Sequence, residues 1–228
     1  MYQQFPVPPA LEADVSFFYV METHQPGPVF EPDVLMPSGT CILGLQYQGN
    51  WVVNSKGFNG PLPRYYVCGQ QTQRYALTPT EPTCGIVGAS LNPTTLWKWF
   101  GRPLASLTDQ VREAGAVFGP AFPAFASAHQ TLTTLEARLR HVADFLGAFA
   151  RGKKHPANVV DAALREIYQA RGCLTTADIR RKLPVSERYL QVLFKKKVGV
   201  SPMTYARLTR FNHLFLEYTR QAGAHSLG

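Results

Sequence analysis

The run SERYLQVLFKKKVG, residues 186–199, decides how the last third of the chain folds. It opens on a serine, which is preferred at the start of a helix, and closes on a glycine, which is preferred just past the end. Its apolar residues Leu190, Leu193 and Phe194 are spaced by three and four, so they form one stripe. We therefore predict a helix over residues 186–198 that is anchored on one side.

The other side of this helix is polar and basic. Arg188, Gln191 and Lys195 recur at the same three-and-four spacing, and Lys196 follows. Upstream, residues 175–183 (TTADIRRKL) predict another short helix that stops before Pro184. Two short helices joined by a tight turn, the second basic on its outer face, are typical of a helix-turn-helix that binds DNA.

The same residues resemble the first helix-turn-helix of AraC/XylS-type transcription regulators, over roughly residues 159–228. Three positions depart from that pattern. Arg180 replaces a small alanine, Pro184 replaces the turn glycine, and Val192 stands where many members carry an arginine that reaches the bases. The shared positions are Ser186, Leu190, Leu193, Phe194, the lysines, Gly199, Ser201, Pro202, Tyr205 and Arg210.

Members of this family continue, after a linking helix, into a second helix-turn-helix. Here the chain ends at residues 224–228 (AHSLG), which resemble the opening of that second unit. Either the chain is truncated or it is a variant with one motif. Because an apolar Leu-Gly end without a polar tail fits an interrupted domain, we expect truncation.

Side-chain chemistry assigns roles to the outer residues of the predicted helix. Arg188 is suited to guanine O6 and N7, and Gln191 to adenine. Lys195, Lys196 and backbone N–H groups near Ser186 are suited to phosphates. Glu187 either accepts from cytosine N4 or stabilises the helix N-terminus. The expected DNA-binding residues are Thr175, Ser186, Glu187, Arg188, Gln191, Val192, Lys195 and Lys196.

The net charge of +8 is concentrated in the C-terminal third. Residues 151–228 contain 15 Lys and Arg against 5 Asp and Glu, whereas residues 1–100 contain 4 against 6. Cations that displace condensed counterions supply most non-specific affinity for DNA, so double-stranded DNA is the expected partner of this segment. No run of 18 apolar residues and no signal peptide is present, and we expect a cytoplasmic protein with no membrane partner.

The N-terminal half reads as β-structure. Short apolar runs at residues 15–21, 41–47, 51–53, 65–68 and 84–91 alternate with Pro- and Gly-rich turns. This spacing predicts an antiparallel barrel or sandwich, and the family resemblance implies a cupin-like barrel. The expected fold class is therefore α+β, with an N-terminal antiparallel β barrel and a helical segment followed by an all-α helix-turn-helix domain.

Metal and enzyme chemistry are not expected in the N-terminal half. Its only histidine in residues 1–100 is His24, and one histidine cannot build a metal site. The four cysteines, scattered without a CxxC pair, fit reduced thiols. No nucleophile or phosphate-loop motif occurs. We expect no cofactor and no enzymatic activity.

Aromatic residues offer a different role for this half. The side chains of Trp51, Tyr65, Tyr66 and Tyr75 either line a pocket for a small-molecule effector or pack in the core.

Residues 131–150 carry an a/d heptad stripe from Leu132 to Phe149. Such a stripe forms either a seam in a homodimer or a contact with the chain's own barrel, and the spacing leaves both open. We expect a cupin-like regulatory and dimerisation domain at 1–150, a linker at 151–156 and an incomplete DNA-binding domain at 157–228. The sequence thus favours a DNA-binding transcription regulator controlled through its N-terminal domain. The alternative is a ligand-binding or interaction module that no longer binds DNA specifically.

Overall fold

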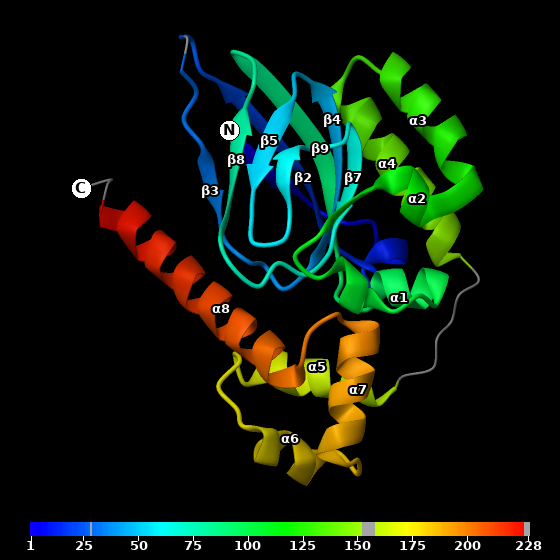
Figure 1. Cartoon of the computed structure of the whole chain (residues 1–228), viewed down its shortest axis with the longest axis vertical. Helices are drawn as coiled ribbons and strands as arrows, with labels where there is room; N and C mark the ends of the chain where they lie inside the picture. Colours follow the sequence, from blue (N-terminus) through cyan, green and yellow to red (C-terminus); the bar gives the residue numbers. More distant parts are fainter. Residues whose placement is uncertain (28, 152–157, 226–228) are drawn as a thin grey trace.

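The computed structural model describes residues 1–27, 29–151 and 158–225. Ten strands form two antiparallel sheets, and helices follow (Figure 1). The six-stranded sheet has the order β1 (Tyr2–Phe5), β2 (Val15–His24), β9 (Thr83–Leu91), β4 (Cys41–Gln48), β7 (Tyr65–Cys68) and β10 (Val111–Glu113). The four-stranded sheet has the order β3 (Asp33–Leu35), β8 (Tyr75–Pro79), β5 (Trp51–Asn54) and β6 (Asn59–Pro61).

The central strands of the six-stranded sheet are buried on both faces, to which successive side chains of a strand point in turn. On β7, Tyr65 and Val67 join a hydrophobic cluster with the helices that follow the strands. Tyr66, between them, joins a cluster with Trp51 and Leu77 of the four-stranded sheet. The middle strands are apolar on both faces for this reason, which matches their nearly continuous hydrophobic sequence.

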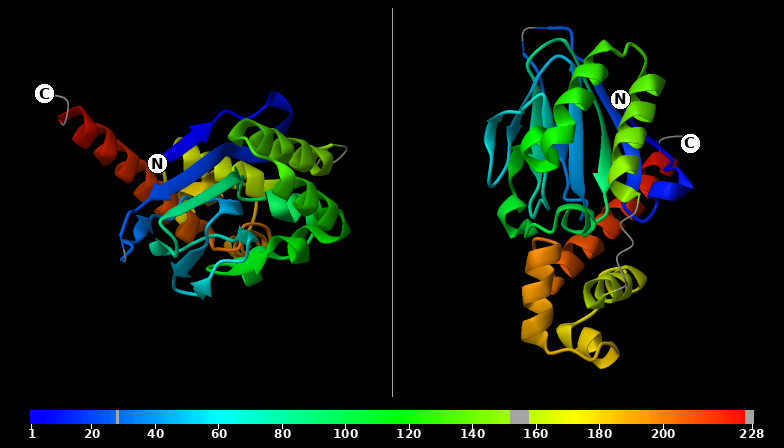
Figure 2. Two further views of the ribbon diagram at one scale, coloured as in Figure 1. Left: turned by 90° about the horizontal axis from the view of Figure 1, so that it is seen from above. Right: turned by 90° about the vertical axis from the view of Figure 1, so that its right-hand side faces the viewer.

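Four helices of this part of the chain are α1 (Thr95–Phe100), α2 (Ala114–Phe118), α3 (Phe122–Thr131) and α4 (Leu135–Ala150), with short 3-10 turns at Pro9–Leu11, Leu104–Leu107 and Gly119–Ala121. Figure 2 shows the longer ones along one side of the strands. The helix predicted at 131–150 begins at Leu135, because Thr134 caps it by accepting from the Ala137 N–H at 3.2 Å.

The heptad stripe of α4 faces the chain's own core. Val142 and Leu146 are fully buried, and Leu135, Leu139 and Phe149 pack around them. Phe145 stacks on Phe125 of α3 with ring centres 4.1 Å apart. The intramolecular alternative therefore describes the stripe, and a homodimer seam along it is not supported.

The remaining helices are α5 (Val159–Gln169), α6 (Thr176–Lys182), α7 (Glu187–Lys197) and α8 (Pro202–His225). They share a separate hydrophobic cluster built on Ile167, Ile179, Phe194 and Tyr205. The buried hydroxyl of Tyr205 hydrogen-bonds that of Tyr168. Within the described residues, no helix is long and apolar enough to cross a membrane.

The predicted α+β class, with antiparallel strands followed by helices, is confirmed. The strands form two sheets rather than one continuously hydrogen-bonded barrel. All five predicted apolar runs are strands, namely β2, β4, β5, β7 and β9. Apart from Arg151, the linker predicted at 151–156 lies outside the described residues.

Candidate nucleic-acid interface and internal cavity

Helices α6 and α7 form the helix-turn-helix expected from the sequence. Ser186 caps α7 by accepting from the Tyr189 N–H at 3.2 Å. Leu190 and Phe194 are buried against the helical core. At the other end, Gly199 adopts a φ of 98°, a left-handed conformation that a side chain would strain.

The buried stripe of α7 leaves the opposite face in solvent. Arg188, Gln191, Lys195 and Lys196 are all exposed there. Val192 is 58% exposed, as its place between Arg188 and Lys196 requires. Gln191 donates to the Glu187 carboxylate at 3.0 Å, so the end of this side chain is held along the helix.

Besides Ser186, two more of the predicted DNA contacts have a structural role. Thr175 forms a capping box with Asp178, in which the Thr175 hydroxyl and N–H both donate to the carboxylate, at 2.7 and 2.8 Å. Glu187 lies in the first turn of α7, where a negative charge favours the helix dipole. Both residues therefore stabilise helix starts, and any contact with DNA comes in addition.

The C-terminal end of α7 contacts the strand-bearing part of the chain, whereas its N-terminal end lies away from it beside α6 (Figure 1). Lys197 places its ammonium group 4.0 Å from the centre of the Trp97 ring on α1. Thr108 donates to the Gly199 carbonyl at 2.8 Å. Lys98 and Asp161 form an ion pair at 3.5 Å. The Lys195 side chain therefore lies nearer this contact than Arg188 does.

A groove lies along the same contact, between α7–α8 and the loops of the strands. Its lining includes Lys56, Arg74, Lys195 and Arg207, with Asp109 as the acidic residue among them. Lys56 and the Thr72 hydroxyl both interact with Asp109, at 3.8 and 2.7 Å. Lys195 thus faces both solvent and this groove.

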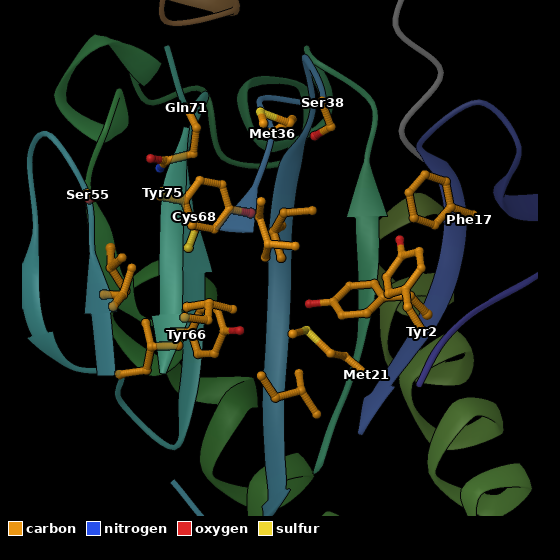
Figure 3. A pocket seen from close by; sticks show the side chains of 18 residues that line it. Tyr2, Phe17, Met21, Met36, Ser38, Ser55, Tyr66, Cys68, Gln71 and Tyr75 are labelled. Carbon is orange, nitrogen blue, oxygen red and sulfur yellow. The ribbon is translucent and has the colours of Figure 1, made fainter. Parts of the chain in front are cut away.

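A cavity of about 180 Å³ lies between the two sheets. Figure 3 shows the rings of Tyr66 and Tyr75 projecting into it, with Met36, Ser38 and Gln71 gathered at one end. Ring atoms of Tyr66 and Tyr19 lie where Gly44 and Gly88 would otherwise carry a Cβ, which would approach them to 2.3 and 2.7 Å. These two glycines let the tyrosine rings lie on the sheet.

Only two of the four aromatic residues proposed for a pocket line this cavity, Tyr66 and Tyr75. Tyr65 points to the opposite face of β7, where its ring meets Phe122 and its hydroxyl donates to Ala126 at 3.4 Å. Trp51 is fully buried in the cluster behind the lining. For these two residues, the core-packing alternative describes their surroundings.

The cavity wall disfavours negative charge. Burial raises the pKa of the Cys68 thiol to about 12 and raises the pKa values of Tyr19, Tyr66 and Tyr75. Among the residues that the structure describes, no group of three His, Cys, Asp or Glu side chains could hold a metal ion.

Comparisons with known proteins agree with this architecture. Residues 3–113 match a family described as a domain of unknown function (DUF6597), which accompanies AraC-type regulators. No curated protein sequence matches the chain. Among solved structures, the chain is similar to fatty-acid-bound ToxT from Vibrio cholerae strain SCE256, with a TM-score of 0.52 and 10% identity over 89% of this chain and 80% of ToxT. It is also similar to the AraC-like transcriptional activator CuxR, with a TM-score of 0.30 and 18% identity over 88% of this chain and 74% of that one.

The chain shares the fold of ToxT. At 10% identity the likeness to ToxT is one of fold alone. Two residues of α7 were not singled out from the sequence. The exposure of Tyr189, whose side chain is 54% exposed beside Arg188, was not predicted because an aromatic residue usually indicates a core position. Lys197 was grouped with Lys195 and Lys196, and only the position of Trp97 separates it from them.

Proposed function

We propose that this chain is a sequence-specific DNA-binding transcription regulator of the AraC/XylS type. Helix α7, at residues 186–198, enters the major groove, and residues 1–150 control it as a regulatory domain joined by the linker at 151–156. The observation that carries the proposal is the two-sided nature of α7. Leu190 and Phe194 are buried, while Arg188, Gln191 and Lys195 are exposed on the other side.

The exposed residues suit distinct parts of a duplex. Arg188 at the free N-terminal end can donate two hydrogen bonds to guanine, and Gln191 can pair with adenine once it leaves Glu187. Val192 presents an apolar surface of the kind that contacts the thymine methyl group. Lys195 and Lys196 hold phosphates, which fixes the register of the helix without reading sequence.

The cavity between the sheets is the proposed effector site. It is internal, mostly apolar and lined by a few hydroxyl groups, as small-molecule sites are. Loop residues Met36 and Ser38 line it, and Gly39 beside them lies against the Tyr205 ring of the helical core. A ligand in the cavity would therefore sit one loop away from the helix-turn-helix.

Binding-site selection from a random duplex library tests this function. The proposal expects an enriched sequence and an affinity that falls steeply with salt. Salt-dependent retention without any enriched sequence would favour the alternative of a ligand-binding or interaction module. Absence of DNA binding at low salt would contradict the proposal.

A further inference from the structure

The polarity of the cavity restricts what can occupy it. None of its 18 lining residues, all within the described part of the chain, is Asp, Glu, Lys, Arg or His. A buried ion without a partner is strongly disfavoured in apolar surroundings. A carboxylate or an ammonium group inside this cavity would have no counter-charge among the lining side chains.

The volume of the cavity sets the size of its occupant. An apolar cavity of about 150 Å³ accepts benzene, and this cavity measures about 180 Å³. One six-membered ring with a small substituent therefore fills it.

Hydroxyl groups inside the cavity differ in how they are engaged. Tyr19 donates to the Leu43 carbonyl at 3.4 Å, and the Tyr2 hydroxyl accepts from the Gln4 amide at 3.2 Å. Ser38 bonds the Thr40 hydroxyl at 2.7 Å. The Tyr75 hydroxyl has no hydrogen-bond partner within residues 1–27, 29–151 and 158–225. It is therefore a donor that a ligand in the cavity can use.

We propose that this cavity binds a small, uncharged, ring-sized molecule that accepts a hydrogen bond from Tyr75. The inference rests on the proposed role of the cavity as the effector site and names the chemical class of that effector. The ring of this molecule packs against the apolar wall of the cavity, and its one polar group faces the Tyr75 hydroxyl.

Three probes of similar size test the proposal on the full chain at neutral pH. They are 4-methylphenol, which is neutral and has an acceptor, toluene, which lacks a polar group, and benzoate, which is charged. Calorimetry and thermal shift should detect 4-methylphenol and toluene and give no response with benzoate. Benzoate binding as tightly as 4-methylphenol, or no binding of either neutral probe, would overturn the proposal.

Two variants assign the binding to this cavity. Tyr75→Phe should weaken 4-methylphenol about three- to tenfold and leave toluene unchanged, because it removes one neutral hydrogen bond. Gly44→Ala should abolish binding of both, since the new methyl group drives the Tyr66 ring into the cavity. Gly147→Ala, on α4 with nothing within 4 Å, is the matched control and should bind like the unmodified chain.

If Gly44→Ala fails to fold, Tyr75→Phe alone tests whether the probes bind in this cavity. Equal affinity of 4-methylphenol for Tyr75→Phe and for the unmodified chain would refute that assignment. DNA binding is measured on the same samples. A chain that binds DNA but no neutral probe refutes the ligand class and leaves the regulator function standing. A chain that binds the neutral probes but no DNA supports the ligand class and contradicts the regulator function.

Discussion

The ammonium group of Lys197 lies 4.0 Å from the centre of the Trp97 ring. This cation–π contact joins the last turn of α7 to α1, two segments separated by a hundred residues of sequence. The partial burial of this side chain lowers the pKa of Lys197. The lysine triplet at the end of α7 is therefore divided into two solvent-facing members and one that holds the two parts of the chain together.

This division predicts different salt dependences for neighbouring lysines. Lys195→Ala should lower the slope of log affinity against log salt concentration by about one, because one phosphate contact is lost. Lys197→Ala should leave the slope nearly unchanged. Fluorescence anisotropy with a duplex at several salt concentrations measures both. Equal slopes for the two variants would mean that Lys197 leaves Trp97 when DNA binds.

Base reading is predicted to reside at the free end of α7. Arg188→Ala should cost about 1–3 kcal/mol on the best site and relax the preference at one base pair. Gln191→Ala should relax a different base pair. Selection from a random library, repeated with each variant, gives the binding logos. If both logos match that of the unmodified chain, α7 does not read bases.

Burial of the α4 stripe predicts the outcome of charge substitutions. Leu146→Glu should destabilise the fold by on the order of 3–5 kcal/mol, since it places an unpaired carboxylate in a fully buried site. Ala148→Glu, exposed on the same helix, should be close to neutral. Urea unfolding followed by circular dichroism compares them. A folded Leu146→Glu variant that has merely lost dimers by sedimentation would restore the seam interpretation.

His129 should make stability depend on pH. Its side chain is fully buried beside Phe125 and His141, and desolvation, reinforced by the Arg138 charge, lowers its pKa to about 4. The native state therefore binds fewer protons than the unfolded state between about pH 4 and 6.5. Its stabilising contribution is complete above pH 6.5 and is lost as the pH falls.

We expect a loss of about 1–3 kcal/mol in the free energy of unfolding between pH 6.5 and 4. Urea unfolding across this range measures it. His129→Phe should flatten the dependence, whereas His24→Gln, an exposed position, should keep it. An identical pH dependence in the unmodified chain and in His129→Phe would exclude His129 as its source.

Sequence patterns predicted the elements whose signals are local. The cap at Ser186 and the spacing of Leu190 and Phe194 fixed α7 to within a residue at either end. The central strands were predictable because they are buried on both faces and read as apolar runs. Strands β1, β3, β6, β8 and β10 were not predicted. Most of them are very short, and edge strands such as β1 and β6 carry exposed or turn-forming residues, so their existence depends on the neighbours that pair with them.

The cavity was less accessible to sequence reasoning. Tyr65 and Tyr66 are adjacent residues of the same type, and only the pairing of β7 with its neighbours decides which ring enters the cavity. The separate role of Lys197 likewise depends on how α1 meets α7. Both properties arise from contacts between distant segments, which a single sequence does not encode in any local pattern.

Gly44 and Gly88 stand directly opposite each other where β4 pairs with β9. Together they leave a bare strip of backbone on which the rings of Tyr66 and Tyr19 rest. This pair can serve as a marker when related chains are compared. A relative that keeps both glycines and both tyrosines should have the same cavity. In a relative with larger residues at both glycine positions, the tyrosine rings should be displaced into the cavity and leave no room for a ligand. An alignment of these four positions would therefore sort ligand-responsive members from members that work without a ligand.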